Sequence, residues 1–231
     1  MISIKNLAVQ YDKHIVLQHL NLEITSAVTH GILGLNGSGK TTMFNAIYGL
    51  LKISDGEIVF DGKVLPKTII SFLESELYFF SNITAREFLL LFENKNNIDV
   101  EQLAAMLHLP LDELIENYSH GMKKKLALLS LLPQDKPLLM LDEPFNGLDL
   151  QSVETLKQII LKLKQQQKTM IISSHIIETL FETCDVIHYL NEGKIEQSFA
   201  RENYNQISET ILKKLNDNTA NKLNSIFDAK A

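Results

Sequence analysis

One eight-residue stretch has the residue types and spacing of a phosphate-binding loop. Gly34 to Thr41, GLNGSGKT, fits G-x-x-x-x-G-K-[ST] at every fixed position, between a short apolar strand pattern and a helical pattern. The glycines let backbone N–H groups wrap around a β-phosphate, the Lys40 ammonium can bridge the β- and γ-phosphates, and the Thr41 hydroxyl can ligate Mg²⁺. The predicted ligand is ATP with Mg²⁺, and the predicted contacts are Gly34, Leu35, Asn36, Gly37, Ser38, Gly39, Lys40, Thr41 and Thr42.

Hydrolysis needs more than a phosphate cradle, and an acidic pair after an apolar run can supply it. The stretch LLMLDEP ends an expected buried strand in Asp142 and Glu143. Asp142 can hold the metal, and Glu143 can orient or deprotonate the attacking water. An acidic pair before Pro144 could also merely mark a turn, but the phosphate loop upstream favours the catalytic interpretation.

A serine, a glycine and three lysines open a later helix in YSHGMKKKL. Ser119 can cap this helix, Gly121 lets another group approach the backbone, and the helix dipole favours an anion. The lysines at positions 123–125 fall on adjacent faces and cannot all point at one phosphate. We therefore expect them to form a solvated face.

Composition favours a folded chain without a global basic field. The 231 residues are 45% apolar, which is enough for a sizeable core, and the formal net charge is −6. Anion recognition must therefore be local, and nucleic acid is not expected as a partner. The single cysteine, Cys184, excludes an intrachain disulfide framework and is expected to be a buried small hydrophobe.

Metal and membrane patterns are weak in this chain. Cys184 and His188 alone fall at a ligand-like interval, in a β-rich stretch, and we expect no metal site built from protein side chains alone. Apolar runs stay well below the ~18 consecutive residues of a spanning helix. Any membrane crossing is therefore expected to belong to another chain.

The first part of the chain predicts an antiparallel region and then the loop-bearing unit. Strand patterns cover 2–9, 15–25 and 56–60, and Asp61-Gly62 is a plausible hairpin turn. The loop is followed by an amphipathic helix in which Phe44, Ile47 and Leu51 share one face. From Thr84 the chain becomes helical, with a Thr84/Glu87 capping box ahead of FLLLF and a second helix in DVEQLAAMLHL.

The remainder alternates between strands and helices. Strands are expected at 137–142 and 169–174, helices at 149–167 and 175–184, and a hairpin at 186–199 with its turn at 191–194. This alternation implies a parallel core sheet. The predicted fold class is α/β, a P-loop NTPase core with a parallel sheet, an antiparallel β subdomain and an inserted α-helical subdomain of about 83–131. A single domain spans 1–231, with a tail of about 200–231 in which 207–215 is weakly amphipathic.

The ordered motifs resemble the nucleotide-binding subunits of ABC transporters over roughly residues 1–199. Tyr118 to Met122 stands where that family has its L-S-G-G-Q signature, and NGLD, ending in Asp149, stands at its D-loop. His175 in SSHIIETL matches the switch histidine, and Tyr11 stands where an aromatic residue stacks on adenine. Alone, His175 would be interpreted as a core or capping residue and Asp149 as a helix cap.

The resemblance implies an ATPase that drives transport. Water would attack the γ-phosphate of Mg-ATP with Glu143 as base, supported by Lys40 and His175. Two such subunits, identical or different, would dimerise head to tail, and Asp149 would link the two sites. Each subunit would present its signature to the ATP of the other, through Ser119, His120, Gly121 and Met122. A separate integral membrane permease would move the substrate, which places this chain in the cytoplasm, peripheral on the inner face of the cell membrane.

Two departures from the family pattern change what is expected. In the signature, His120 replaces the first glycine and Met122 the glutamine, while the serine and second glycine remain, so ATP clamping should survive. Signatures with a bulky or basic residue in place of the first glycine and methionine after the second resemble those of certain bacterial export-type subfamilies, which favours export. The Q-loop region, ISFLESELYFFSNITAREF, contains no glutamine; Ser75 falls at that position, with Glu74 beside it.

Two other functional classes stay open from the sequence. A regulatory ABC-type ATPase, in which ATP drives assembly rather than translocation, would share every motif. A small-molecule kinase would share the phosphate loop but would not need the signature or NGLD. The transported substrate is not encoded in recognisable residues, because substrate contacts would lie in the permease.

Overall fold

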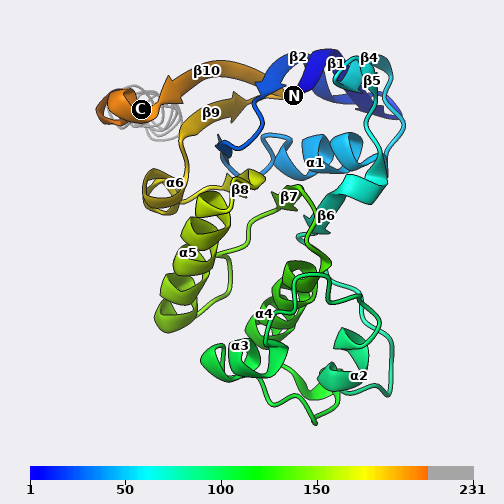
Figure 1. Cartoon of the computed structure of the whole chain (residues 1–231). Helices are drawn as coiled ribbons and strands as arrows, with labels where there is room; N and C mark the ends of the chain where they lie inside the picture. The colour runs from blue at the N-terminus through cyan, green and yellow to red at the C-terminus, as the bar shows by residue number, and fades with distance from the viewer. Residues whose placement is uncertain (208–231) are drawn as a thin grey trace, which may run out of the picture.

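The computed structural model describes residues 1–207 and contains two β-sheets with helices on their faces (Figure 1). The expected amphipathic stretch 207–215 lies outside the described residues from 208 onwards. The strands are β1 (Ile2–Tyr11), β2 (His14–Ile24), β3 (Thr29–Leu33), β4 (Asp55–Phe60), β5 (Lys63–Val64), β6 (Ile70–Leu73), β7 (Leu138–Leu141), β8 (Thr169–Ser174), β9 (Val186–Asn191) and β10 (Lys194–Ala200). The α-helices are α1 (Lys40–Tyr48), α2 (Ala85–Leu89), α3 (Val100–Met106), α4 (His120–Leu131), α5 (Leu150–Gln165) and α6 (Ile177–Thr183).

The central sheet is mostly parallel, as the alternation of strands and helices predicted. Its strand order is β10-β9-β3-β8-β7-β6, and only the β10–β9 pair is antiparallel. The second sheet, ordered β2-β1-β4-β5, is antiparallel throughout. The α/β fold class with a parallel core and an antiparallel β region is confirmed.

Both predicted hairpin turns are present and have the backbone that such turns require. Asp61 and Gly62 join β4 to β5 with φ values of 47° and 75°. Glu192 and Gly193 join β9 to β10 with φ values of 46° and 75°. Two successive positive φ angles match the right-handed twist of the flanking strands, which explains the acidic residue followed by glycine in both turns.

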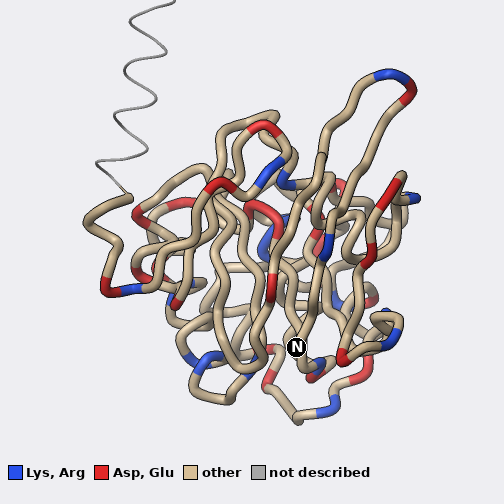
Figure 2. Tube along the Cα trace, turned by 90° about the horizontal axis from the view of Figure 1, so that it is seen from above, with Lys and Arg blue, Asp and Glu red and all other residues tan. Residues whose placement is uncertain are grey.

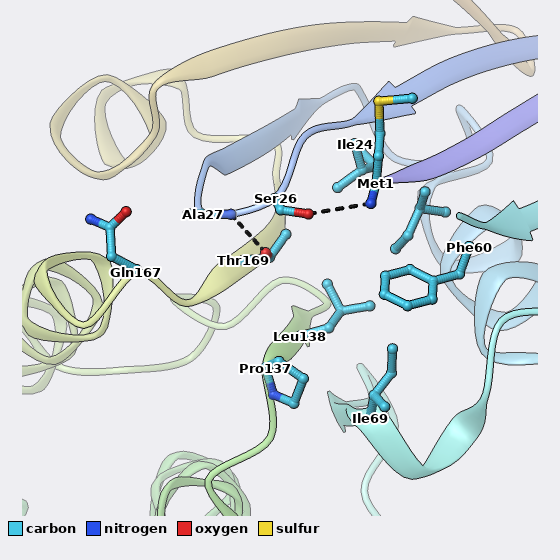
Figure 3. A pocket seen from close by; sticks show the side chains of 11 residues that line it. Met1, Ile24, Ser26, Ala27, Phe60, Ile69, Pro137, Leu138, Gln167 and Thr169 are labelled. Carbon is cyan, nitrogen blue, oxygen red and sulfur yellow. Dashed lines mark hydrogen bonds between the residues drawn. The ribbon is translucent and has the colours of Figure 1, made fainter. Parts of the chain in front are cut away.

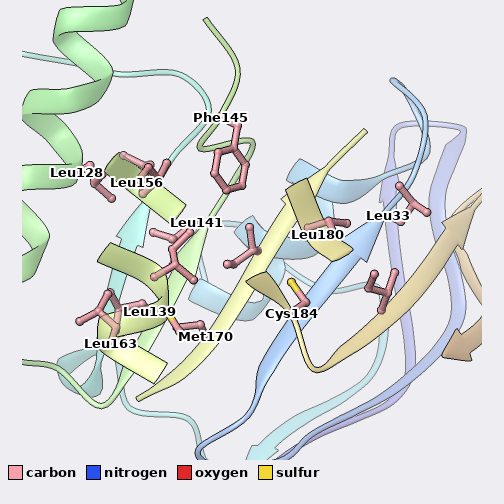
Figure 4. Packing of buried hydrophobic residues seen from close by; sticks show 14 of the residues in the cluster. Leu33, Leu128, Leu139, Leu141, Phe145, Leu156, Leu163, Met170, Leu180 and Cys184 are labelled. Carbon is pink, nitrogen blue, oxygen red and sulfur yellow. The ribbon is translucent and has the colours of Figure 1, made fainter. Parts of the chain in front are cut away.

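Two hydrophobic clusters cover the two faces of the parallel sheet. One packs β7 and β8 residues such as Leu141 and Met170 against α5, α6 and α4 (Figure 4), and includes the buried Cys184, as expected from the sequence. The other joins the antiparallel sheet, α1 and the opposite face of the parallel strands around Phe44 and Ile32. The sheet is therefore buried on both faces, as is usual for parallel strands.

The helices α2, α3 and α4 lie together at the end of the molecule away from the antiparallel sheet (Figure 1) and share a third hydrophobic cluster. The Thr84/Glu87 capping box is confirmed at the start of α2. The helix expected through FLLLF is wrong in extent, because α2 ends at Leu89 and leaves Leu90 and Leu91 78% and 60% exposed. Similarly α1 ends at Tyr48, since Gly49 adopts a φ of 78°, so Leu51 packs on the core from outside the helix.

Charge is distributed over the molecule rather than concentrated on one face. Figure 2 shows Lys and Arg positions interspersed with Asp and Glu positions along the trace. Within residues 1–207, none of the helices combines the length and the apolarity needed to cross a membrane.

Candidate functional site

The glycine-rich loop joins the end of β3 to the start of α1. Gly37 and Gly39 have φ values of 81° and 106°, a region that residues with a Cβ rarely adopt. A Cβ on Gly34 would lie 2.4 Å from Ser38 Oγ and 2.6 Å from the Leu190 carbonyl oxygen. The loop conformation thus depends on glycine at the motif positions, and it ends at the N-terminus of α1, where N–H groups are free to bind an anion.

Lys40 folds back over this loop. Its side chain is 6% exposed, and Nζ donates to the carbonyl oxygens of Gly34 at 2.7 Å and Leu35 at 3.1 Å. The same Nζ lies 3.1 Å from Glu143 Oε1. The ammonium is therefore held at the mouth of the loop by partners that a phosphate oxygen can replace.

Thr41, in the first turn of α1, and Asp142, directly after β7, come together. The Thr41 hydroxyl donates to Asp142 Oδ2 at 2.7 Å, and the Ser173 hydroxyl donates to Asp142 Oδ1. Asp142 is fully buried, and its N–H donates to the Leu73 carbonyl oxygen at 2.9 Å. This carboxylate is fixed by two hydroxyl donors and by its own backbone.

Glu143 turns its side chain towards the loop from an unusual backbone conformation. Its φ is 49°, and its N–H donates to Ser173 Oγ at 2.7 Å. One carboxylate oxygen faces Lys40, and the other lies 3.0 Å from His175 Nδ1. His175 precedes α6 by two residues rather than opening the helix, and its side chain is 34% exposed. A carboxylate, an ammonium and an imidazole therefore meet beside the loop.

A cavity of 370 Å³ lies against these groups. His14 and Val16 at the start of β2 form its wall on the antiparallel-sheet side, and Glu143 borders it opposite. Tyr11, 46% exposed at the end of β1, lies outside the lining. The remaining lining residues are Asn36, Gly37, Gly39, Lys40, Thr41 and Thr42. Six of the nine predicted loop contacts thus face one cavity.

The donor set beside this cavity suits a hard divalent cation. Thr41 Oγ1 and Asp142 Oδ2 are oxygen donors 2.7 Å apart, and a hydroxyl with a carboxylate is the ligand chemistry of Mg²⁺ when nucleotide phosphates complete the shell. Residues 1–207 contain no group of three or more His, Cys, Asp or Glu side chains that could hold a metal ion by themselves. The residues therefore fit an ion bound together with a nucleotide.

The signature stretch, Tyr118 to Met122, forms the N-terminus of α4 and packs against the D-loop, Asn146 to Asp149, of the same chain. Ser119 caps the helix, accepting from the Met122 N–H at 3.2 Å, and is itself exposed. A Cβ on Gly121 would lie 2.7 Å from the Gly147 carbonyl oxygen, and the His120 ring lies against Gly147. Gly121 is thus required for close packing inside the chain as well as for any approach from outside.

The expectation of a solvated lysine face is wrong for two of the three lysines. Lys124 is 2% exposed and Lys125 7% exposed, because α4 packs between the first and third hydrophobic clusters. Lys124 Nζ donates to the carbonyl oxygens of Glu143 and Asn146, and Lys125 Nζ pairs with Asp149 at 3.0 Å. Both amines are directed into the protein, towards the segment that carries the acidic pair and the D-loop.

Asp149 is the N-cap of α5, which confirms the interpretation of this residue as a helix cap. Its side chain accepts from the Ser152 N–H at 2.9 Å and the Ser152 hydroxyl at 2.8 Å. These bonds, together with the Lys125 ammonium, hold the pKa of the Asp149 carboxyl well below its usual range. The cap therefore stays ionised at any physiological pH.

The Q-loop region follows β6 next to the acidic pair. The Asp142 N–H donates to the carbonyl oxygen of Leu73, the last residue of β6. The exposed Glu74 is the next residue, so it lies close to the acidic pair. Partial burial raises the pKa of the Glu74 carboxyl, and Ser75 beside it is half-buried. Glu74 and Glu76 border a cavity of 200 Å³ whose other walls come from β6, α2 and α4.

A third cavity, of 210 Å³, lies at the opposite edge of the sheets (Figure 3). It is bordered by the first residues of β7 and β8 and by Phe60 at the end of β4. At its rim the Met1 ammonium donates to Ser26 and the Ala27 N–H donates to Thr169. Its lining includes none of the described residues of the glycine-rich loop, so this cavity is separate from the one beside Lys40 and Glu143.

Sequence reasoning missed three contributors to the site. Ser173 was recognisable only from strand pairing, because Leu141 pairs with Ile172 and so places Asp142 opposite Ser173. His14 lines the cavity because the β1–β2 hairpin lies beside the glycine-rich loop in the fold. No local sequence pattern indicates that proximity.

The third, Lys124, sits inside a lysine run whose simplest interpretation is solvation, so its contacts with the acidic turn had no local signal.

Comparison with known proteins identifies the family. The family model described as "ABC transporter" matches residues 17–146, more than half of the chain. The lantibiotic transport ATP-binding protein SrtF of Streptococcus pyogenes is 29% identical over 203 residues, covering 84% of this chain and 89% of SrtF. The bacitracin transport ATP-binding protein BcrA of Bacillus licheniformis is 33% identical over 210 residues, covering 84% and 68%.

Solved structures agree with the sequence relatives. A bacterial ABC transporter cassette, solved as a dimer, superposes with a TM-score of 0.76 at 25% identity, over 87% of this chain and 99% of that one. The ATP-binding subunit of another ABC transporter shares the fold with a TM-score of 0.78, over 91% and 93% of the two chains. The chain therefore belongs to the ABC transporter family as a nucleotide-binding domain, and it is an ATPase.

Proposed function

We propose that this chain hydrolyses Mg-ATP with Glu143 as the group that orients or deprotonates the attacking water. The observation that carries the proposal is the Glu143 carboxylate beside the glycine-rich loop, held between Lys40 Nζ at 3.1 Å and His175 Nδ1 at 3.0 Å. Lys40 would bridge the β- and γ-phosphates, and His175 would support the γ-phosphate as its charge redistributes. Geometry of this kind suits in-line attack by water, since base and phosphate donors converge on one point.

Mg²⁺ is proposed as the companion ion, held by Thr41 and Asp142 with the nucleotide. It would neutralise charge on the β- and γ-phosphate oxygens during transfer. Ser173 keeps the Asp142 carboxylate in place from the neighbouring strand. Tyr11 is proposed to stack on adenine, with His14 and Val16 forming the wall that the structure adds beside it.

We infer that two such subunits close head to tail around two ATP molecules. Ser119 is exposed at the N-terminus of a twelve-residue helix, where a γ-phosphate of a partner subunit could accept its hydroxyl and the helix N–H groups. His120, Gly121 and Met122 would line the same contact, and Asp149 would relate the two sites. The similarity to a cassette solved as a dimer supports this assembly.

The proposed partner in the membrane is a separate permease, and the proposed direction is export. The cavity bordered by Glu74 and Glu76 lies between the Q-loop region and α4, where a cytoplasmic helix of the permease would dock. SrtF and BcrA are named for transport of a lantibiotic and of bacitracin, which supports a peptide antibiotic as the class of cargo. The subunit would then be cytoplasmic and peripheral on the membrane.

Size-exclusion chromatography with light scattering tests the core of this proposal. Glu143→Gln should form a dimer in Mg-ATP, because ATP stays bound when the base is removed, and should remain monomeric without nucleotide. Ser119→Arg in the same background should abolish the dimer while leaving nucleotide binding intact. A Glu143→Gln protein that binds ATP yet stays monomeric would contradict the composite site. Copurification with a hydrophobic permease tests the transport role separately.

A further inference from the structure

Lys124 is a buried cation that the hydrolysis scheme does not use. The residue is 2% exposed. Within residues 1–207, no carboxylate oxygen lies at salt-bridge distance from the Lys124 ammonium. Burial lowers the pKa of Lys124, and the nearby Glu143 and Asp142 carboxylates oppose that shift. Lysines are rarely this buried unless the ammonium is hydrogen-bonded, so the hydrogen-bond partners of Nζ indicate the role of this residue.

Both partners are backbone carbonyls in the turn that begins with the proposed base. Nζ donates to the Glu143 carbonyl oxygen at 2.6 Å and to the Asn146 carbonyl oxygen at 3.2 Å. The Asn146 N–H closes the same turn by donating to the Glu143 carbonyl at 3.2 Å. Glu143 has a φ of 49°, in the left-handed region that residues with a Cβ adopt uncommonly.

The direction of the Glu143 side chain depends on this backbone. The carboxylate reaches Lys40 and His175 only because the residue leaves β7 in the left-handed region instead of continuing the strand. Rotation of the Glu143–Asn146 turn would swing the carboxylate away from the loop. A bond that pins the carbonyl of Glu143 therefore pins the aim of its side chain.

Lys124 also belongs to the signature helix. It follows Ser119 by five residues on α4, so the two are rigidly connected through one and a half helical turns. We propose that Lys124 is a positioning residue that holds the Glu143 turn against the signature helix. Binding of α4 to the partner's ATP and orientation of Glu143 towards the subunit's own ATP then occur together. This inference rests on the proposed head-to-tail function.

The test uses full-length protein and compares turnover with nucleotide affinity. Lys124→Met should lower kcat for ATP at least about ten-fold, because ångström-scale misplacement of a catalytic group is that damaging. Affinity for a fluorescent ATP analogue should be unchanged, since the loop and Lys40 are untouched. Lys136→Met is the matched control: Lys136 Nζ also donates to a backbone carbonyl, that of Ile70, but at the far end of β6. Lys124→Arg, which keeps charge and donors, should recover most of the lost turnover.

A double-mutant cycle with Glu143→Gln separates positioning from general structural damage. If Lys124 acts through Glu143, Lys124→Met should reduce the residual single-turnover rate of Glu143→Gln by less than about two-fold. Equal losses in both backgrounds, or no loss in the wild-type background, would overturn the inference. If Lys124→Met does not fold by circular dichroism, Lys124→Gln, a polar side chain too short to reach both carbonyls, replaces it in the same cycle. Wild-type protein that binds Mg-ATP without hydrolysing it would instead refute the proposed function, and this inference with it.

Discussion

Acid should destabilise this protein through a pair of histidines buried between β3, β9 and β10. His30 Nδ1 lies 3.0 Å from His188 Nε2, and His188 Nδ1 lies 2.7 Å from Ser198 Oγ. Both rings are almost fully buried. Burial lowers the pKa of His188 from 6.5 to about 3, with His30 as a second cause, and burial also lowers the pKa of His30. Two neighbouring imidazoles inside the sheet cannot both accept a proton.

The sign and size of the effect follow from the His188 pKa. Because the folded-state value is the lower one, the unfolded chain binds more protons below pH 6.5, so stability is complete above that pH and is lost as the pH falls towards 3. Between pH 7 and pH 5, protonation of the unfolded chain at His188 alone removes about 2 kcal/mol from the free energy of unfolding. His30 adds to this loss in the same direction.

Urea unfolding at pH 7, 6 and 5 measures the effect. His188→Gln retains an amide that can bond to Ser198 but does not titrate, so its free energy of unfolding should fall less over this range than that of the wild type, by about 2 kcal/mol. Changes at carboxyl groups are common to both proteins and cancel in the comparison. Parallel pH profiles for the two proteins would refute the buried-pair reasoning.

Three further outcomes are expected. Gly121→Ala should destabilise the protein by about 1–3 kcal/mol in urea and weaken the ATP-dependent dimer, because the new methyl meets the Gly147 carbonyl at 2.7 Å; a more stable variant would contradict this. Thr41→Val, nearly equal in shape, should lose the Mg²⁺ dependence of ATP affinity, measured by titration with and without the ion, because the hydroxyl proposed to ligate the ion beside Asp142 is removed. The Cys184 thiol, whose pKa burial raises to about 12, should react with a thiol reagent at pH 8 only after unfolding; rapid labelling of the native protein would contradict its burial.

Local patterns were sufficient where the physics is local. The positive φ angles at Asp61-Gly62, the capping box at Thr84 and the cap at Asp149 each depend on a few adjacent residues, and each is present as predicted. The apolar run FLLLF shows the limit of such patterns. Its residues are apolar enough for a helix core, yet α2 ends at Leu89, and within residues 1–207 the next two leucines are left largely exposed.

The lysines of α4 show why tertiary context can reverse an interpretation. A run of three charges on a helix is usually solvated, and only the packing of α4 between two hydrophobic clusters turns Lys124 and Lys125 inward. Their partners, the Glu143 carbonyl and the Asp149 carboxylate, lie about twenty residues further along the chain. The fold, not the helix, supplies the groups that make those charges tolerable.

The arrangement of parallel strands explains why separate motifs become one site. The glycine-rich loop follows β3, Asp142 and Glu143 follow β7, and Glu74 follows β6. β8 ends in Ser173 and Ser174, just before His175. These strands run in the same direction, so their carboxyl ends meet at one edge, which is where α/β sheets bind ligands. Strand order therefore explains why these groups lie at one edge of the sheet. It does not predict α4, which reaches the same edge from outside the sheet, and for that reason the proposed link from the signature helix to Glu143 needs its own experiment.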